Sequence, residues 1–203
     1  MIYLISGAPR VGKSILAAQL AEQLGIPHID TDLVCDAYRD TLSDSDRATQ
    51  FPFPNFSGDA KENHHSAAQL VTLQITSATS LEPELYRLIR DQIARHTSVV
   101  IEGIHLLPTF IHSLRQEYFD SFRTICIGSQ DIDVVLHGLE DDQRPDNWMR
   151  ESDADVKRQV AAFVIAFSER IHEEAVRLQL PYQERTPNFE NDLLRFLQLL
   201  RTA

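Results

Sequence analysis

A glycine-bounded segment near the N-terminus has the spacing of a phosphate-binding loop. The motif Gly-x4-Gly-Lys-Ser/Thr is matched in full by Gly7, Ala8, Pro9, Arg10, Val11, Gly12, Lys13 and Ser14. In such a loop, glycine permits the backbone angles that turn successive N–H groups toward phosphate oxygens. The lysine ammonium spans two phosphates, and the serine hydroxyl is a ligand for Mg²⁺. These eight residues therefore predict the binding of a nucleotide with its Mg²⁺ ion.

The elements around this loop are a strand and a helix, which is the context that the motif requires. Residues 2–6 form an apolar run typical of a buried strand, and residues 13–24 place three leucines on one helical face. Gly25 ends that helical pattern. A chance match to the motif would not also lie at a strand-to-helix junction, so the location supports a nucleotide site.

The rest of the chain alternates short apolar runs with helical patterns. Further strands are expected at residues 26–29, 98–102, 122–127 and 180–183. Helices are expected at residues 66–80, 82–96, 132–139, 153–179 and from 186 to about 200. Apolar strands that are joined by helices indicate a parallel sheet with both faces covered. The predicted fold is a three-layer α/β P-loop NTPase fold with a five-stranded parallel sheet and a helical substrate and lid region.

Two irregular segments interrupt this alternation. Residues 41–65 are rich in Pro, Phe, Ser and Asp, and residues 140–150 are mostly polar and charged. Long irregular stretches in a compact domain are usually functional loops. We therefore expect one domain over residues 1–203, with a substrate-binding insertion at about 33–97 and a lid at about 140–152.

The composition excludes several classes of protein. Among 203 residues, 19 Lys and Arg against 30 Asp and Glu give a formal net charge of −11, which repels nucleic acid and anionic lipid. No stretch approaches the ~18 apolar residues of a membrane span, and the first residues lack the pattern of a signal peptide. Cys35 and Cys126 have no CxxC spacing and are expected to be free thiols. We expect a cytoplasmic protein, monomeric or homodimeric, with no nucleic-acid or membrane partner.

Other motifs narrow the class of nucleotide-binding protein. Guanine-specific GTPases use Asn-Lys-x-Asp and Asp-x-x-Gly, but no lysine here follows an asparagine and no glycine follows an aspartate by three positions. The Leu-Ser-Gly-Gly-Gln signature of transporter-type ATPases is also missing, and the chain is short for an oligomeric remodelling ATPase. A small-molecule kinase remains as the leading class.

Several segments carry a resemblance to known kinases. Residues 5–14 and 20–32 resemble the start of P-loop small-molecule kinases such as shikimate and gluconate kinases. Asp30 and Asp32 resemble the Asp-x-Asp that follows the second strand in shikimate kinases. Residues 101–108 (Ile-Glu-Gly-Ile-His-Leu-Leu-Pro) are similar to the third-strand segment of 2-phosphoglycerate kinases and related P-loop kinases. The resemblance implies transfer of the γ-phosphate of ATP to a small-molecule acceptor, with Mg²⁺ as cofactor.

The resemblance also implies roles for the two aspartates. Asp30 would face Mg²⁺, together with Ser14, and Asp32 would accept a hydrogen bond from the acceptor hydroxyl. The alternative is that one aspartate only caps the helix that starts near residue 33. The two roles are compatible with each other.

Glu102 and His105, at and just beyond the end of the third predicted strand, are further candidates for the site. Glu102 ends an apolar strand, and the carboxyl ends of parallel strands open onto the ligand crevice, so we expect it to hold the substrate or a metal-bound water. His105 is expected to bind substrate as well. The alternatives are a solvated or salt-bridged Glu102 and a His105 that only packs and caps.

Charge on the transferred phosphoryl group requires cations, and the planar arginine fork suits phosphate oxygens. Arg144 and Arg150 lie in the segment where these kinases carry their lid, so they and Lys13 are the expected catalytic cations. Arg39 is the expected substrate-binding residue of the insertion. The alternative for each arginine is a surface residue that pairs with the abundant acids.

Two interpretations from different classes stay open. The first is an ATP-dependent kinase of a small hydroxylated metabolite or a nucleotide-like acceptor, and a nucleoside monophosphate kinase would differ from it only in the acceptor. The second is an ATP-binding regulatory or switch protein with weak ATPase activity and a macromolecular partner. Acceptor-stimulated release of ADP distinguishes the first from the second.

Overall fold

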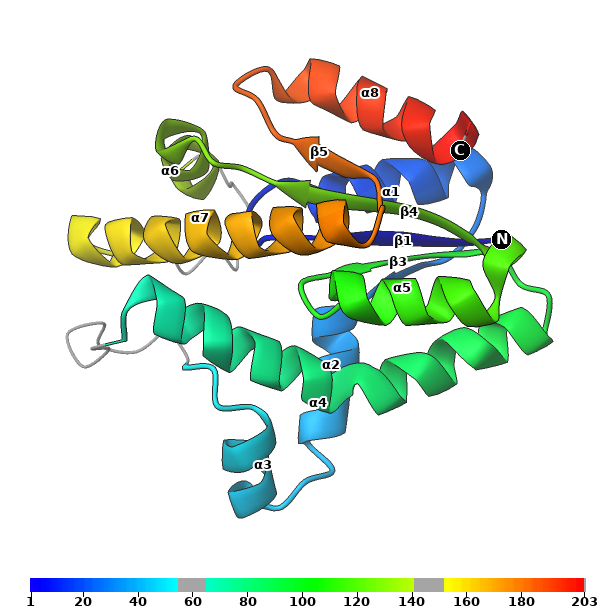
Figure 1. The fold of residues 1–203 in the computed structure, drawn as a ribbon, viewed down its shortest axis with the longest axis horizontal. Helices are drawn as coiled ribbons and strands as arrows, with labels where there is room; N and C mark the ends of the chain where they lie inside the picture. Colours follow the sequence, from blue (N-terminus) through cyan, green and yellow to red (C-terminus); the bar gives the residue numbers. More distant parts are fainter. Residues whose placement is uncertain (55–64, 141–151, 203) are drawn as a thin grey trace.

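Five parallel strands form the sheet at the centre of the molecule (Figure 1). The computed structural model describes residues 1–54, 65–140 and 152–202. The strands are β1 (Ile2–Gly7), β2 (His28–Asp30), β3 (Val99–Gly103), β4 (Phe122–Gly128) and β5 (Tyr182–Glu184), in the spatial order β2-β3-β1-β4-β5. All pairings are parallel, and β1 lies between β3 and β4. The predicted five-stranded parallel sheet is therefore confirmed.

Helices cover both faces of this sheet and give a three-layer architecture (Figure 1). The helices are α1 (Lys13–Leu24), α2 (Thr31–Arg39), α3 (Asp44–Gln50), α4 (Ala67–Ala94), α5 (Pro108–Glu117), α6 (Ile132–Glu140), α7 (Ala154–Arg177) and α8 (Phe189–Thr202), with a short 3₁₀ helix at Phe119–Ser121. α1 and α8 lie on one face, whereas α4, α5 and α7 lie on the other. No helix in the described ranges is long and apolar enough to span a membrane.

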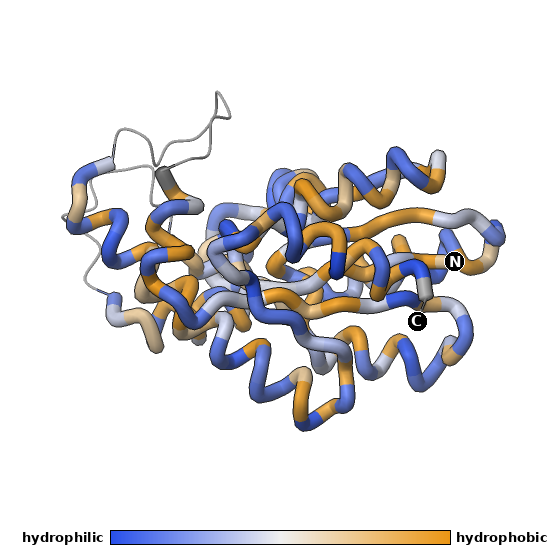
Figure 2. Tube along the Cα trace, turned by 90° about the horizontal axis from the view of Figure 1, so that it is seen from above, coloured by the Kyte–Doolittle hydropathy of each residue, from blue (hydrophilic) through white to orange (hydrophobic). Residues whose placement is uncertain are grey.

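The hydrophobic core lies between these layers. Apolar residues run along the central strands, whereas the helices alternate apolar and polar positions (Figure 2). Leu4, Ile5, Ile101 and Ile125 are fully buried, as expected for strands with helices on both faces. Cys35 and Cys126 are also buried and form no disulfide. Because β1, β2 and β3 are parallel and adjacent, their carboxyl ends lie at the same end of the sheet.

The boundaries of several helices differ from those predicted. The two helices expected at residues 66–80 and 82–96 are one 28-residue helix, α4, with Pro83 inside it. Proline removes one helical hydrogen bond and favours a break, but here the stripe of buried residues continues from Leu70 to Ile89 on both sides of it. Packing, mainly against α7 and α2, therefore outweighs the local preference, and α4 bends near its middle (Figure 1).

Three other segments correct the expectations from sequence. The segment 41–65, expected to be irregular, contains α3 at Asp44–Gln50, whose N-cap Ser43 accepts a hydrogen bond from the backbone N–H of Asp46. α5 follows β3 directly, with Pro108 in its first turn, and had not been expected. α8 begins at Phe189, later than expected, because Asn188 caps its first turn through a hydrogen bond from the N–H of Asn191.

Candidate active site

The phosphate-binding loop connects β1 to α1 and contacts the end of β4. Gly7 has a φ of 141°, and a Cβ atom there would lie 1.9 Å from the carbonyl oxygen of Ile127. The N–H of Ala8 donates to the same carbonyl oxygen at 3.1 Å. Gly12 has a φ of 92° and caps α1. Both glycines of the motif therefore occupy conformations that a side chain would disfavour.

The Lys13 ammonium lies inside this loop. Its side chain is buried, and Nζ donates to the carbonyl oxygen of Ala8 at 2.7 Å. Burial lowers the pKa of Lys13, while the charges of Glu102, Asp32 and Asp30 act in the opposite direction. A cation is therefore held at the loop with carboxylates around it.

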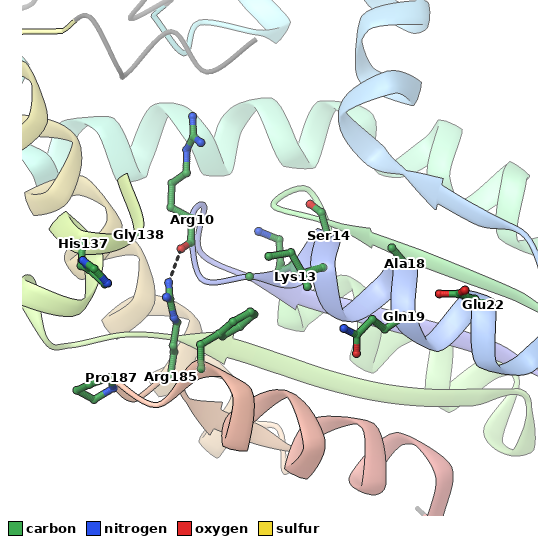
Figure 3. A pocket seen from close by; sticks show the side chains of 13 residues that line it. Arg10, Lys13, Ser14, Ala18, Gln19, Glu22, His137, Gly138, Arg185 and Pro187 are labelled. Carbon is green, nitrogen blue, oxygen red and sulfur yellow. Dashed lines mark hydrogen bonds between the residues drawn. The ribbon is translucent and has the colours of Figure 1, made fainter. Parts of the chain in front are cut away.

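A cavity of about 890 Å³ opens in front of the loop (Figure 3). The lining residues come from the phosphate-binding loop, α1, α6, the connection between β5 and α8, and the first residue of α8: Arg10, Gly12, Lys13, Ser14, Ile15, Ala18, Gln19, Glu22, His137, Gly138, Arg185, Pro187 and Phe189. Its volume lies within the range that is typical of small-molecule and cofactor sites. The cavity therefore has room for a nucleotide whose phosphates reach the N-terminus of α1.

Carboxylates gather beside the loop at the ends of β2 and β3. The sheet register places Asp30 opposite Glu102, and Glu102 opposite Ile5 of β1. Glu102 is only 2% exposed, and its Oε1 lies 3.8 Å from Nε2 of His28. Burial pushes the pKa of Glu102 up, but His28, Lys13 and the Ser14 hydroxyl outweigh it, so the pKa lies below the usual value. Glu102 is therefore a buried carboxylate that stays ionised.

Asp30 has the capping role that the sequence had left open. It is the N-cap of α2, and its Oδ1 accepts a hydrogen bond of 2.8 Å from the N–H of Asp32. Burial raises the pKa of Asp30, and this hydrogen bond opposes the rise. Asp32 lies in the first turn of α2, and its side chain is 65% exposed. The cap thus fixes the start of the helix that carries Asp32.

His105 is buried in the protein and contacts Asp32 from the interior side. Its Nδ1 lies 3.1 Å from Oγ1 of Thr31, and the same atom lies 3.4 Å from Oδ1 of Asp32. Burial, with the charge of Lys13, lowers the pKa of His105 to about 4. The imidazole is therefore neutral near pH 7, and its contact with Asp32 is a polar contact and not an ion pair.

The arginines expected at the site differ in their positions. Arg39 lies in the last turn of α2, near Asp36 and over the ring of Phe51 at 5.9 Å from its centroid. Its charge contributes to the lowered pKa of His105, so it lies on the side of the site that carries Asp32. Arg144 and Arg150 lie outside the described residues.

The sequence analysis did not identify the cavity-lining residues that lie away from the phosphate-binding loop in the sequence. His137 lies in α6, and Arg185, Pro187 and Phe189 lie in or next to the connection that follows β5. The available signal was topological: this connection follows the carboxyl end of a parallel strand, where ligands bind in such sheets. No motif marks these residues.

The donor set at the loop suits Mg²⁺. Ser14, Asp30 and Glu102 offer hydroxyl and carboxylate oxygens, the ligands that this ion prefers. Within the described ranges, no three or more His, Cys, Asp or Glu residues form a cluster that could hold a metal by themselves. This arrangement fits an ion that is bound by one or two protein oxygens together with substrate phosphates and water.

Comparison with solved structures gives the fold family. A shikimate kinase from Bacteroides thetaiotaomicron has a TM-score of 0.56 and 16% identity, over 99% of this chain and 98% of that chain. A shikimate kinase from Acinetobacter baumannii in complex with shikimate has a TM-score of 0.51 and 12% identity, over 99% and 93%. A gluconokinase from Sinorhizobium meliloti 1021 has a TM-score of 0.50 and 13% identity, over 98% and 90%. Neither a protein-family model nor a curated protein matches the sequence.

The chain therefore has the three-layer α/β fold of the P-loop small-molecule kinases. The resemblance to shikimate and gluconate kinases, which the sequence had indicated, is confirmed at the level of the fold. At these identities the likeness shows the fold alone.

Proposed function

We propose that this protein is an ATP- and Mg²⁺-dependent kinase that transfers the γ-phosphate of ATP to a hydroxyl group of a small molecule. One observation carries the proposal: Lys13, buried in a complete phosphate-binding loop, lies among the charges of Glu102, Asp32 and Asp30. Phosphoryl transfer depends on such an arrangement, because catalysis comes mainly from positioning and from neutralising phosphate charge. The fold of solved small-molecule kinases supports it.

The loop residues 7–14 bind the triphosphate in this proposal. Their backbone N–H groups and the N-terminus of α1 contact phosphate oxygens, and Lys13 leaves the carbonyl of Ala8 to contact the phosphates. Ser14, Asp30 and Glu102 would hold Mg²⁺ directly or through water. When bound, this ion neutralises charge that develops on the phosphate oxygens.

Asp32 is the residue that receives the proton of the acceptor hydroxyl. Its carboxylate is exposed at the start of α2, at the same end of the sheet as the phosphate-binding loop. Neutral His105 contacts its Oδ1 from below and so restricts its orientation. This changes the role expected for His105: it is a positioning residue for Asp32, and the substrate contacts Asp32.

The acceptor binds next to α2 in this proposal. Residues 33–97 form the substrate-binding region, Arg39 contacts the acceptor from the last turn of α2, and residues 140–152 form the lid with Arg144 and Arg150. The bound shikimate of the Acinetobacter baumannii enzyme supports a small hydroxylated metabolite as the class of acceptor. The net charge of −11 supports a protein without a nucleic-acid partner, and we infer a cytoplasmic monomer or homodimer.

The fate of the γ-phosphate tests this proposal. The protein is incubated with Mg²⁺ and ATP labelled on the γ-phosphate, together with pools of sugars, hydroxy acids, nucleosides, nucleotides or aminocyclitols. Label in an organic phosphate supports the kinase and identifies the pool. Label only in inorganic phosphate, with ATP-dependent association to a macromolecule, supports a regulatory switch instead.

A further inference from the structure

The phosphate-binding loop contains a backbone conformation that its sequence does not favour. Arg10 has a φ of 64°, in the left-handed region where glycine is favoured and other residues are disfavoured. Such a conformation persists only where the surrounding structure holds it. The loop therefore needs a contact that keeps Arg10 in place.

Arg185 supplies a contact of this kind from the other end of the chain. Its Nη1 donates a hydrogen bond of 3.0 Å to the carbonyl oxygen of Arg10, as Figure 3 shows. The bond fixes the orientation of the peptide group that follows Arg10. The next N–H groups of the loop are the ones that face bound phosphates in loops of this type.

Phe189 connects the same arginine to the second half of the loop. The guanidinium of Arg185 stacks over the ring of Phe189, 4.8 Å from its centroid. That ring packs on Gly12 so closely that a Cβ atom there would lie 2.4 Å from Cε2. Arg185 and Phe189 thus contact the loop at both Arg10 and Gly12.

Arg185 is itself held by the end of the sheet. Its backbone N–H donates to the carbonyl oxygen of Gly128 at 2.8 Å. The next N–H, that of Thr186, donates to Oδ2 of buried Asp192 at 2.6 Å. A Cβ atom on Gly138 would lie 2.8 Å from Nη1 of Arg185, so α6 also approaches the guanidinium closely. The contact to Arg10 therefore comes from a fixed position.

We propose that Arg185 is a positioning residue that holds the phosphate-binding loop in its phosphate-accepting shape through the carbonyl of Arg10. This inference rests on the proposed function and deepens it, because it concerns the same nucleotide site. A loop that is already shaped for phosphate loses less conformational freedom on binding and so binds ATP more tightly.

Equilibrium binding of Mg·ATP and of tripolyphosphate tests the proposal in four proteins: wild type, Arg185→Gln, Arg10→Gly and the double variant. We expect Arg185→Gln to weaken both ligands at least about tenfold, because tripolyphosphate has no base or ribose and depends on the loop alone. In the Arg10→Gly background the same substitution should weaken binding less than about threefold, because glycine adopts this φ without help. Arg201→Gln, in α8 and hydrogen-bonded to Gln23 of α1, is the matched control and should bind as wild type does.

Each outcome has a separate meaning. Unchanged Kd values in folded Arg185→Gln overturn the inference and leave the kinase proposal standing. An equal loss in both backgrounds also overturns it, because Arg185 would then contact the nucleotide independently of Arg10. A wild-type protein that binds neither ligand contradicts the proposed function itself. If Arg185→Gln does not unfold cooperatively, Arg185→Lys, which loses the planar fork, replaces it in the same cycle.

Discussion

The Nδ1 atom of His105 lies 3.4 Å from Oδ1 of Asp32, and the imidazole is buried while the carboxylate is exposed. The same Nδ1 lies 3.1 Å from the hydroxyl of Thr31, which is fully buried. A neutral imidazole that approaches a carboxylate from the protein side restricts its orientation without neutralising its charge. The contact therefore orients Asp32 and adds no opposing charge to it.

Asp32→Asn should remove most turnover while ATP binding is retained. The amide keeps the shape of the side chain but cannot accept the proton of the acceptor hydroxyl, so kcat should fall about 100-fold or more. The Kd for Mg·ATP should change less than about threefold, because the phosphates bind at the loop. Single-turnover phosphate transfer and equilibrium titration measure the two quantities.

Asp36→Asn is the matched control for that substitution. Asp36 lies one helical turn further along α2, with 70% of its side chain exposed. Its kcat should stay within about threefold of wild type. Equal decreases in kcat in both variants would mean that turnover depends on the negative charge of α2 and not on a specific proton acceptor.

His105 should make the protein less stable in mild acid. Burial lowers its pKa from 6.5 to about 4 in the folded protein, with Lys13 and Arg39 acting in the same direction and Asp36 against it. Between these two pH values the unfolded chain binds a proton that the folded chain does not, so stability falls as pH falls, by up to ~1.4 kcal/mol per pH unit. Loss begins near pH 6.5 and is complete below about pH 4.

Denaturant unfolding of wild type and His105→Asn at about pH 7 and about pH 5 measures this contribution. Asparagine places an amide near the position of Nδ1 but does not titrate. Wild type should lose more free energy of unfolding than the variant between the two pH values. Parallel losses in the two proteins would show that His105 is not the group responsible.

Gly103→Ala should destabilise the protein far more than Gly25→Ala. Gly103 has a φ of 153°, and a Cβ atom there would lie 1.7 Å from Oγ1 of Thr31, the hydroxyl that contacts His105. Gly25 also has a positive φ, of 64°, but has open space around its Cα. We expect about 1 kcal/mol of destabilisation at Gly25 and about 3 kcal/mol or more at Gly103.

The free energies of unfolding of these two glycine variants separate backbone strain from steric overlap. Similar values would mean that strand β3 shifts easily and that Thr31 is not held in place. A large difference would support the rigid contact from Gly103 through Thr31 to His105.

Local patterns in the sequence are sufficient to predict the loop, the strands and most helices. Residues 2–24 combine a complete motif with a strand and a helix, and these three signals are independent of distant residues. The break expected between residues 80 and 82 was wrong, because the burial that makes α4 continuous depends on packing against other elements, which local patterns do not include.

The arrangement of the site depends on contacts between distant residues. Arg185 and Arg10 lie 175 positions apart, and no local pattern links them. The cap formed by Asp30 is local and could be named as an alternative, whereas the contact of His105 with Asp32 requires the register of β2 against β3. The lid roles of Arg144 and Arg150 stay predictions.

The most direct test of kinase activity is ADP release from Mg·ATP, measured across sugars, hydroxy acids, nucleosides, nucleotides and aminocyclitols. Lys13→Ala and, as a matched control, Lys157→Ala in α7 are measured beside wild type. We expect one class of acceptor to stimulate ADP release by wild type and by Lys157→Ala, and Lys13→Ala to lose this stimulated release by about 100-fold or more. Acceptor-stimulated release that survives in Lys13→Ala would contradict the proposed kinase activity at the phosphate-binding loop.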